Sequence, residues 1–375
     1  MGIDVPSSSS HASNVSGNFS TFQTTTPAVT TWEDSPSYKE FFVGSYNFIV
    51  VNFVRTTNGN YSFTHDLPAD FAKCIRNLSL CDLYILIALS VVWTWLRDAM
   101  SKHIFRPTSD MFHLDKDGKE KLPESMWKAF FYGLSWSFTA YVLIVQENGR
   151  YFQRPTTVWT DYAIDAKVST TVYIVYLAQA SFYIHSLYAT IFQDSWRKDS
   201  VVLLVHHVVA TILLTVSWSA RYHFFGLTCI FLHDCCDVLL EVTKSFNYLK
   251  NQQKGVVKSF EVVADIGFLC FTATWFVMRL YLFPLRVLYY SSVYVEQEGI
   301  YTPFGFFLNM LMYLLLAMNV YWFTLILHVL YKVVIGQTLE DVRDFKEDEE
   351  EAEVLQVLKP SDVGDDKRKK INDKN

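Results

Sequence analysis

The segment HHVVATILLTVSWSARYHFFGLTCIFLHDCCD, residues 206–237, decides the fold of this chain. Two adjacent histidines begin a run rich in Val, Ile and Leu, and a second apolar run ends in His233, Asp234 and Asp237. Only a short connection at 220–223 separates the runs. Each run extends outward toward the roughly 20 apolar residues that a helix needs to cross a bilayer. We therefore expect two antiparallel membrane helices that carry ionisable side chains.

The same apolar character recurs along the chain. Of its 375 residues, 51% are hydrophobic and 17% are aromatic, and the apolar residues occur in long blocks rather than alternating with polar ones. This pattern predicts an all-α polytopic membrane protein with about seven transmembrane helices and argues against a soluble fold. The expected spans are 80–97, 126–146, 168–192, 201–219, 224–243, 261–287 and 304–335.

The charge is unevenly distributed. The formal net charge is −6, and residues Glu340 to Asn375 hold 13 acidic and 8 basic side chains, a net of −5, which leaves −1 for the rest of the chain. Because the chain has no basic excess, we do not expect it to bind nucleic acid.

The loops after the first, third and fifth expected spans hold most of the loop Lys and Arg residues. The positive-inside rule then places the N-terminus outside the cytosol and the C-terminus inside it. Glycosylation sequons at Asn14, Asn18 and Asn60 agree with a lumenal N-terminal segment.

These observations divide the chain into five parts. We expect a lumenal, partly disordered and glycosylatable segment at 1–79, a first transmembrane helix at 80–97 and a cytosolic linker at 98–125. A catalytic bundle of six spans follows at 126–336, and an acidic cytosolic tail occupies 337–375.

Ionisable residues inside two neighbouring spans point to a functional pocket. The expected span at 201–219 carries His206 and His207. The span at 224–243 carries His233, Asp234, Asp237 and Glu241, and Lys244 follows it directly. Residues 233, 237 and 241 follow the i, i+4, i+8 spacing of one helix face, and Asp234 lies on the adjoining face. Buried ionisable groups are costly in a membrane and usually mark a function. We expect an intramembrane pocket in the cytosolic half of the bundle.

Three interpretations of this pocket are open on the residues alone. The groups can tie helices together by hydrogen bonds, although five of them on two spans exceed what that requires. A zinc ion held by two histidines and an aspartate is compatible with the spacing, but the many-histidine patterns of membrane di-iron enzymes are absent, and we predict no metal. We favour acid–base or nucleophilic catalysis, in which imidazole reacts and a carboxylate orients it.

A series of motifs resembles one family. In order they are SFY (181–183), D-x-x-RKD (194–199), HH (206–207), HD-x-x-D (233–237) and LE-x-x-K (240–244), followed by MRLYLFPLRVLYY (278–290) and MNVYWF (318–323). This order resembles the ceramide synthases, within the TLC-domain family, over about residues 125–340. The resemblance implies a six-span TLC bundle in the endoplasmic reticulum membrane that joins an acyl chain from acyl-CoA to the amine of sphinganine or sphingosine.

The resemblance also implies roles for individual residues. The essential histidines and aspartates of the family fall on His206, His207, Asp234 and Asp237, and His233 and Glu241 belong to the same motif. We take His233 as catalytic and Arg197, Lys198, Glu241 and Lys244 as substrate-binding. One departure is Ala210, where relatives often have Ser or Thr; Thr211 offers a hydroxyl at the next position.

The 98–125 linker is too short for the homeobox-like insert of many ceramide synthases. In this respect the chain resembles the insert-free, type-one branch of the family. The resemblance implies a preference for stearoyl-CoA and a role of segment 288–303 in the choice of acyl-chain length. The implied partners are acyl-CoA as co-substrate, a sphingoid base, membrane lipids and a second synthase protomer in a homo- or heterodimer. No cofactor is implied.

Two chemical routes fit these residues. The acceptor amine is largely protonated at neutral pH, as Lys is, and a histidine can remove its proton. Alternatively, a histidine attacks first and forms an acyl-imidazole that the amine then opens. The alternative function is a non-catalytic TLC protein that senses lipids, transfers them or assists translocation.

Overall fold

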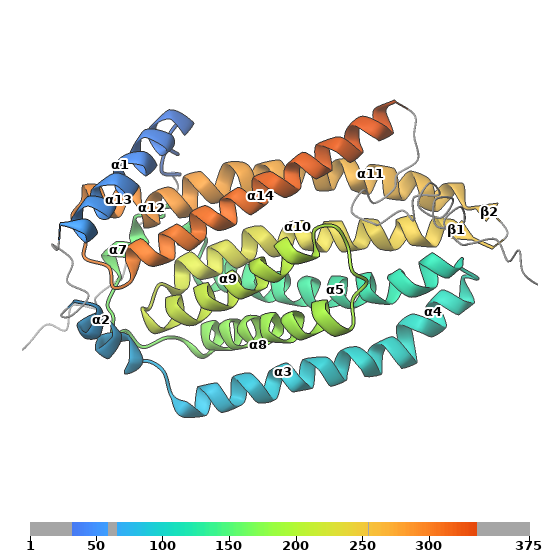
Figure 1. The fold of residues 1–375 in the computed structure, drawn as a ribbon, viewed down its shortest axis with the longest axis horizontal. Helices are drawn as coiled ribbons and strands as arrows, with labels where there is room; N and C mark the ends of the chain where they lie inside the picture. The colour runs from blue at the N-terminus through green and yellow to red at the C-terminus, as the bar shows by residue number, and fades with distance from the viewer. Residues whose placement is uncertain (1–31, 59–65, 254, 336–375) are drawn as a thin grey trace, which may run out of the picture. The chain divides into compact units, whose positions relative to one another are not determined.

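The computed structural model describes residues 32–58, 66–253 and 255–335 (Figure 1). The all-α prediction is confirmed: within these residues the only strands are the two-residue β1 (Asn251–Gln252) and β2 (Gly255–Val256), which pair antiparallel. The long helices are α3 (Leu80–Met100), α5 (Lys116–Ala140), α8 (Thr170–Phe192), α9 (Ser200–Ser219), α10 (His223–Lys250), α11 (Lys258–Trp275) and α14 (Gly305–Val334). The predicted sequons Asn14, Asn18 and Asn60 and the predicted tail 337–375 lie outside the described residues.

Shorter elements complete the chain. The remaining α-helices are α1 (Tyr38–Thr57), α2 (Asp66–Ile75), α4 (Arg106–Met111), α6 (Arg150–Gln153), α7 (Thr157–Thr160), α12 (Tyr289–Ser291) and α13 (Val293–Gln297). Three π-helical segments, η1 (Ser101–Phe105), η2 (Tyr141–Gln146) and η3 (Phe276–Leu288), continue α3, α5 and α11 without a break.

Each expected span coincides with a helix. Among the described residues, five stretches are long and apolar enough to cross a membrane: Leu80–Met111, Lys116–Gln146, Ser200–Ser219, Lys258–Gln297 and Gly305–Val334. The expected spans at α8 and α10 are not among them, because both helices carry many polar side chains. At 1.5 Å per residue their 23 and 28 residues reach about 35 and 42 Å, which exceeds the hydrocarbon thickness of a bilayer. The chain is a multi-pass membrane protein.

The linker expected at 98–125 is mostly helical. The first span continues through η1 and α4 to Met111, and α5 begins ten residues before the predicted start of the second span. The Asp115 side chain accepts a hydrogen bond from the Gly118 backbone N–H at 2.7 Å and caps α5. Because this cap fixes the start of the helix, the apolar pattern alone placed the boundary too late.

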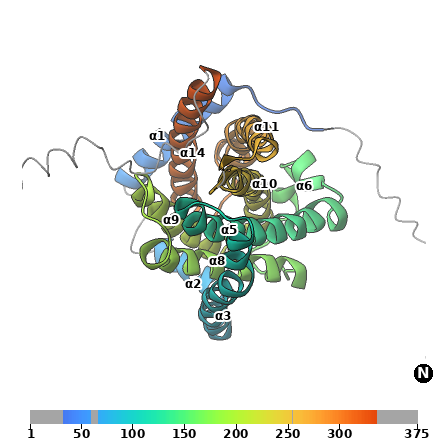
Figure 2. The same cartoon turned by 90° about the vertical axis from the view of Figure 1, so that its right-hand side faces the viewer.

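Helix α10 lies at the centre of the bundle. It packs against α5 on one side, against α11 and η3 on another, and against α8 and α9. Helix α14 packs against α9 and η3, whereas α3 packs against α8 at the periphery (Figures 1 and 2). The side chains of α5, α8, α9, α10, η3 and α14 therefore converge on a common interior.

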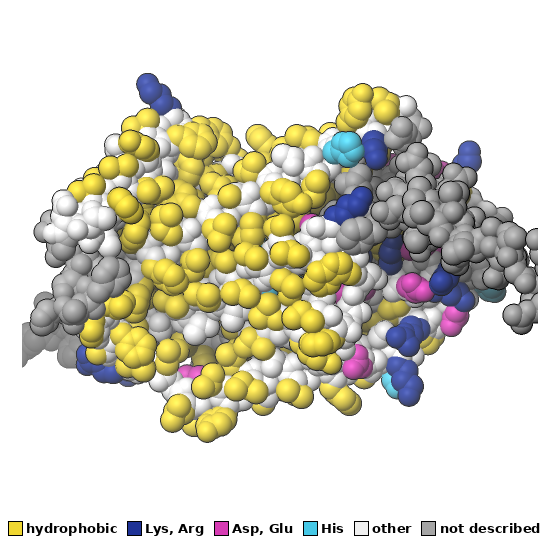
Figure 3. All heavy atoms as spheres, viewed as in Figure 1, with side chains coloured by type: hydrophobic (Ala, Val, Ile, Leu, Met, Phe, Trp, Pro, Cys, Tyr) yellow, Lys and Arg dark blue, Asp and Glu magenta, His cyan; other side chains and the backbone are white. Residues whose placement is uncertain are grey.

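The surface has the character that a bilayer requires. Hydrophobic side chains cover the middle of the face in Figure 3, and charged side chains gather toward the end that holds α4 and the β1–β2 hairpin. Large apolar residues are openly exposed, for example Leu80 at 75% and Tyr84 at 72%. An exposed apolar belt of this kind is stable in lipid and a liability in water.

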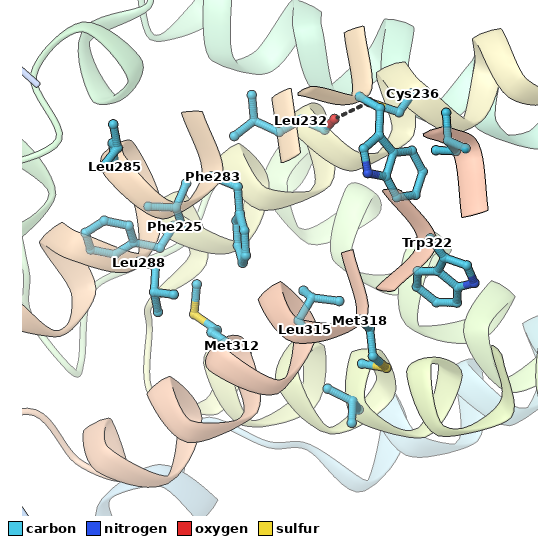
Figure 4. Packing of buried hydrophobic residues seen from close by; sticks show 14 of the residues in the cluster. Phe225, Leu232, Cys236, Phe283, Leu285, Leu288, Met312, Leu315, Met318 and Trp322 are labelled. Carbon is cyan, nitrogen blue, oxygen red and sulfur yellow. Dashed lines mark hydrogen bonds between the residues drawn. The ribbon is translucent and has the colours of Figure 1, made fainter. Parts of the chain in front are cut away.

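The largest hydrophobic core lies between α10, η3 and α14. Figure 4 shows Phe283, Leu285 and Leu288 of η3 near Phe225 of α10 and Met312 of α14. Further along α14, Leu315, Met318 and Trp322 continue the same row. This core holds α14 against the helices that carry the ionisable residues.

One close approach depends on a glycine. A Cβ atom at Gly226 of α10 would lie 1.8 Å from the Tyr176 hydroxyl oxygen of α8. That hydroxyl donates to the His223 carbonyl oxygen at 3.2 Å. Glycine at position 226 leaves the space that the Tyr176 side chain occupies against the backbone of α10.

Helix α1 precedes the predicted first span. Ser37 and Glu40 form a capping box at its start, and the helix buries Phe41 and Phe48. Its contacts are with α12, α13 and η3. The N-terminal segment expected at 1–79 therefore contains ordered helix.

Candidate active site

A cavity of about 180 Å³, whose wall carries a cluster of ionisable side chains among apolar ones, lies where α9 begins and α10 ends. Its walls come from α3, α5, α8, α9, α10, α11, η3 and α14. Among its lining residues are His185, His206, His207, Asp237, Glu241, Lys244, Arg197 and Arg279. We call it the polar cavity. It brings together most of the residues that the sequence singled out.

His206 and His207 both line the polar cavity, with ring centroids 5.8 Å apart. The ring of Tyr183 lies 6.0 Å from the first and 5.8 Å from the second. The His206 ring also meets Trp322 of α14 edge-on at 5.4 Å. The Nδ1 atom of His206 is buried without a hydrogen-bond partner among the described residues, which leaves this imidazole unconstrained by any carboxylate.

A second cavity, of about 100 Å³ and lined mainly by apolar residues, lies on the other side of His206. We call it the apolar cavity. It is lined from His206 to Ser217 on α9, from Tyr222 to His233 around α10, and from Gly305 to Leu315 on α14. His206 lines both cavities, so its imidazole lies where the cavity that holds most of the ionisable side chains meets the apolar one.

His233 lies in the wall of the apolar cavity with both ring nitrogens engaged. Its Nδ1 lies 2.8 Å from the Cys229 carbonyl oxygen, which can only accept, so Nδ1 carries the hydrogen. Its Nε2 then accepts from the Asn319 side-chain amide at 3.1 Å. These two bonds fix the tautomer and leave His233 without a free lone pair for substrate.

Asp237 forms a buried ion pair with Arg279 of η3. The carboxylate Oδ1 accepts from the guanidinium at 2.6 Å, and the same guanidinium donates to the His233 carbonyl oxygen at 2.9 Å. Arg279 also donates to Asn319 Oδ1 at 3.3 Å and lies 4.0 Å from the face of the Trp275 ring. The cation is thereby compensated, while Asp237 keeps 19% of its side chain exposed toward the polar cavity.

Asp234 points away from both cavities. It is 1% exposed, and its Oδ2 accepts hydrogen bonds of 2.6 Å from Ser135 of α5 and from Gln179 of α8. The carboxylate joins three helices behind the site. Neither Asp234 nor Asp237 hydrogen-bonds to a histidine, so the orientation of imidazole by carboxylate that the sequence suggested is not part of this geometry.

The residues expected to bind substrate fall into two groups. Glu241 and Lys244 pair at 2.9 Å and line the polar cavity, and Arg197 lines it while pairing with Glu124 at 3.0 Å. Lys198 is exposed and lies outside the cavity wall. Three of the four residues are thus brought together, and the fourth lies on the loop beside them.

An ionic network closes the side of the polar cavity next to α3. Asp194 accepts from Arg97 at 2.6 Å and from Lys128 at 2.9 Å, and Lys128 also reaches Glu124 at 2.7 Å. Burial by itself raises the pKa of the Asp194 carboxyl, but the charges of Lys128 and Arg97 outweigh it and hold this pKa below its usual value. The network fixes the α8–α9 loop to α3 and α5.

Comparisons with known proteins agree with this arrangement. A family model described as the TLC domain matches residues 121–328. Human ceramide synthase 1 is 43% identical over 280 residues, which are 74% of this chain and 78% of that protein. Mouse ceramide synthase 1 is 40% identical over 72% of this chain and 77% of that protein.

The chain belongs to the ceramide synthase family. Bovine ceramide synthase 4 is a more distant relative, 34% identical over 60% of this chain and 54% of its own length. The matched TLC domain begins within α5, so helix α3, which contributes Arg97 to the wall of the polar cavity, lies outside the matched residues.

Sequence reasoning missed four polar residues in and around this candidate site. Arg279 and Asn319 lie inside apolar spans, within the MRLYLF and MNVYWF segments that extended the resemblance. His185 lines the polar cavity, with its Nδ1 2.9 Å from Thr94 Oγ1, and Lys128 lies in the ionic network. Each was visible as a polar residue in a span, but no spacing linked it to residues on distant helices.

The described residues contain no group of three or more His, Cys, Asp and Glu side chains arranged to hold a metal ion. His206 and His207 share the polar cavity with Asp237, but that carboxylate is committed to Arg279. A cationic guanidinium beside the carboxylate disfavours a second cation there. The donor set of this candidate site therefore suits proton transfer better than metal binding.

Proposed function

We propose that the chain is an acyltransferase that moves a long fatty acyl group from acyl-CoA to the amine of sphinganine or sphingosine, giving dihydroceramide or ceramide. The observation that carries this proposal is the position of His206 in the walls of both cavities. An acyl thioester has an apolar chain on one side of its carbonyl and a polar carrier on the other. The names of the relatives, ceramide synthases, support the same reaction.

In this proposal the acyl chain occupies the apolar cavity and the thioester carbonyl lies at His206. The CoA portion extends through the polar cavity toward the α8–α9 loop. Arg197 and Lys244 in the cavity wall and Lys198 on that loop attract its phosphates, and Glu241 holds Lys244 in place. The apolar groups of the sphingoid base remain in the membrane.

The two adjacent histidines divide the chemistry. The substrate ammonium binds near the Asp237 carboxylate and loses one proton to His207, which lines the polar cavity but not the apolar one. The free amine then attacks the acyl carbon, either on the thioester held at His206 or on an acyl-imidazole formed when His206 displaces the thiolate. In the direct route one C–N bond forms and one C–S bond breaks; in the acyl-imidazole route the C–N bond to His206 forms as the C–S bond breaks and is itself broken when the amine forms the amide C–N bond. In both routes the ammonium and the thioester give amide, thiol and one proton. The reaction needs no cofactor.

His233, Asp234 and Arg279 act as positioning residues in this scheme. His233 and Arg279 link α10, η3 and α14 on one side of the site, and Asp234 links α10 to α5 and α8 on the other. Together they hold His206 and Asp237 at a constant separation. Electrostatic preorganisation of this kind lowers the reorganisation that the reaction requires.

The finer features of the proposal are the stearoyl preference, the endoplasmic reticulum membrane and a second synthase protomer as partner. A lumenal N-terminus and a cytosolic C-terminus complete it. The charged side chains gathered at the α4 and β1–β2 end support a cytosolic position for that end (Figure 3). A membrane location is appropriate because the sphingoid base and the product dissolve in lipid.

The test is a product assay with purified protein in detergent. Sphinganine and an equimolar mixture of acyl-CoAs are supplied, and N-acyl products are read by mass spectrometry. We expect product from the wild type and none from His206→Ala or His207→Ala. His103→Ala is the matched control, because His103 is exposed on η1 away from the cavity, and it should retain wild-type activity.

Absence of product from well-folded wild type would support the alternative of a non-catalytic TLC protein that senses lipids, transfers them or assists translocation. Full activity in both cavity variants would show that the histidines have another role. Either result would overturn the proposed mechanism.

A further inference from the structure

The apolar cavity extends well away from the reacting histidine. On α9 its wall runs from His206 to Ser217, which spans about 16 Å at 1.5 Å per residue. Trp159 of α7 lines the cavity and packs against Tyr222 and Phe225 at the start of α10, with ring centroids 5.8 Å and 5.3 Å away. These contacts place the indole at the end of the cavity opposite His206.

Trp159 lies in the connection between η2 and α8 rather than in one of the long helices of the bundle. Helix α7 is four residues long and lies between η2 and α8. The indole Nε1–H donates to the Tyr290 carbonyl oxygen at 2.8 Å, and the ring of Tyr162 packs against it at 5.6 Å. A hydrogen bond and three aromatic neighbours therefore hold the indole in one orientation.

We propose that Trp159 is the stop for the distal end of the acyl chain and so sets the longest chain that the enzyme accepts. This inference rests on the proposed function, because it requires the acyl chain to occupy the apolar cavity. A chain that exceeds the space between His206 and the indole either displaces the ring or shifts its carbonyl away from His206. Misplacement of a reacting carbonyl by one carbon–carbon bond is enough to lower the rate strongly.

The segment 288–303 acts through the same residue. Tyr290 supplies the carbonyl that orients the indole, and Ser291 and Thr302 line the cavity beside it. Changes in this segment alter the position of Trp159 and the depth of the cavity together. Through these contacts, the position of a segment remote from His206 is coupled to the position of the Trp159 indole.

The experiment measures the product distribution from sphinganine and an equimolar series of saturated acyl-CoAs of increasing length. We expect Trp159→Leu to shift the distribution toward longer chains, with the ratio of longer to native-length product rising about tenfold or more. Trp159→Phe also removes the indole hydrogen bond but takes away less side-chain volume than Trp159→Leu. It should therefore shift the product distribution in the same direction by a smaller amount. Trp95→Leu is the matched control: Trp95 is 69% exposed on α3 and does not line the cavity, so the product distribution of this variant should match wild type.

A reciprocal variant separates the inference from the function on which it rests. Met312 of α14 lines the same cavity, and Met312→Trp should fill it and favour shorter chains. A shift in Met312→Trp without a shift in either Trp159 variant would overturn the role of Trp159 and leave the acyl-binding role of the cavity intact. No shift in any of these variants would overturn both, as would a wild type that forms no product.

Discussion

The buried ion pair between Asp237 and Arg279 allows a quantitative prediction. Of the four groups described above as contacting the Arg279 guanidinium, only Asp237 is anionic. Asp237→Ala removes it and leaves the Arg279 cation, which is 2% exposed, without a counter-charge among them. Loss of one partner of a buried pair costs about 3–5 kcal/mol, since the remaining charge is uncompensated. We expect the lower end, about 3 kcal/mol, because the His233 carbonyl, the Asn319 amide oxygen and the Trp275 ring still face the guanidinium.

The measurement is unfolding in mixed micelles at increasing SDS concentration, followed by tryptophan fluorescence. The matched control is Glu296→Gln, which removes the anionic partner of the exposed Arg55–Glu296 pair, whose side chains are 51% and 24% exposed. An exposed pair contributes about 0–1 kcal/mol, so this variant should unfold close to wild type.

A second substitution tests the physical reason. Arg279→Met removes the uncompensated cation, so the double variant Asp237→Ala with Arg279→Met should be at least as stable as Asp237→Ala alone. A double variant that is clearly less stable than the single one would refute the reasoning, because the loss would then come from packing rather than from charge. Activity should be low in every variant that lacks Asp237.

Two further predictions concern a close helix contact and the ionic network. Gly226→Ala should destabilise the protein, because its methyl carbon would lie 1.8 Å from the Tyr176 hydroxyl oxygen and 2.8 Å from Tyr176 Cζ. Adding Tyr176→Phe removes the closer overlap and should restore part of the loss in a thermal unfolding assay. A failure of Tyr176→Phe to restore stability would show that the strain lies elsewhere. The folded-state pKa of Asp194 is lowered, so its contribution to stability is present above the unfolded value of 3.8 and is lost as pH falls through the folded value. Asp194→Asn should therefore unfold at a lower temperature than wild type at about pH 7. Between about pH 5 and pH 3 the unfolding temperature of this variant should fall less than that of wild type. Parallel plots of unfolding temperature against pH for the two proteins would contradict the lowered pKa.

Much of the fold follows from the sequence because the bilayer restricts the possibilities. Every expected span is a helix. The sequence put His206, His207 and Asp237 on neighbouring spans, and the three residues do line one cavity. Long apolar blocks are strong signals of membrane helices, because only helices and closed barrels satisfy all their backbone hydrogen bonds in lipid.

The partners of the carboxylates could not be predicted in the same way. Helix spacing put Asp234 on a face beside Asp237, but it does not say which helix covers that face, and Ser135 and Gln179 lie 99 and 55 residues away along the chain. Arg279 lies 42 residues from Asp237. Such pairings depend on how the helices pack against one another, which periodicity within one helix does not encode.

The peripheral helix α3 has a consequence for biosynthesis. It contacts α8 through three polar pairs: Trp93 with Ser181 at 2.9 Å, Thr94 with His185 at 2.9 Å, and Arg97 of α3 with Asp194 just beyond α8 at 2.6 Å. The partners are separated by 88, 91 and 97 residues, so the ribosome delivers α3 to the membrane well before it makes α8. An unpaired arginine and threonine facing lipid are costly. For about ninety residues of translation, the polar side of α3 therefore needs water or another protein beside it, and the nascent chain is exposed to misassembly until α8 arrives.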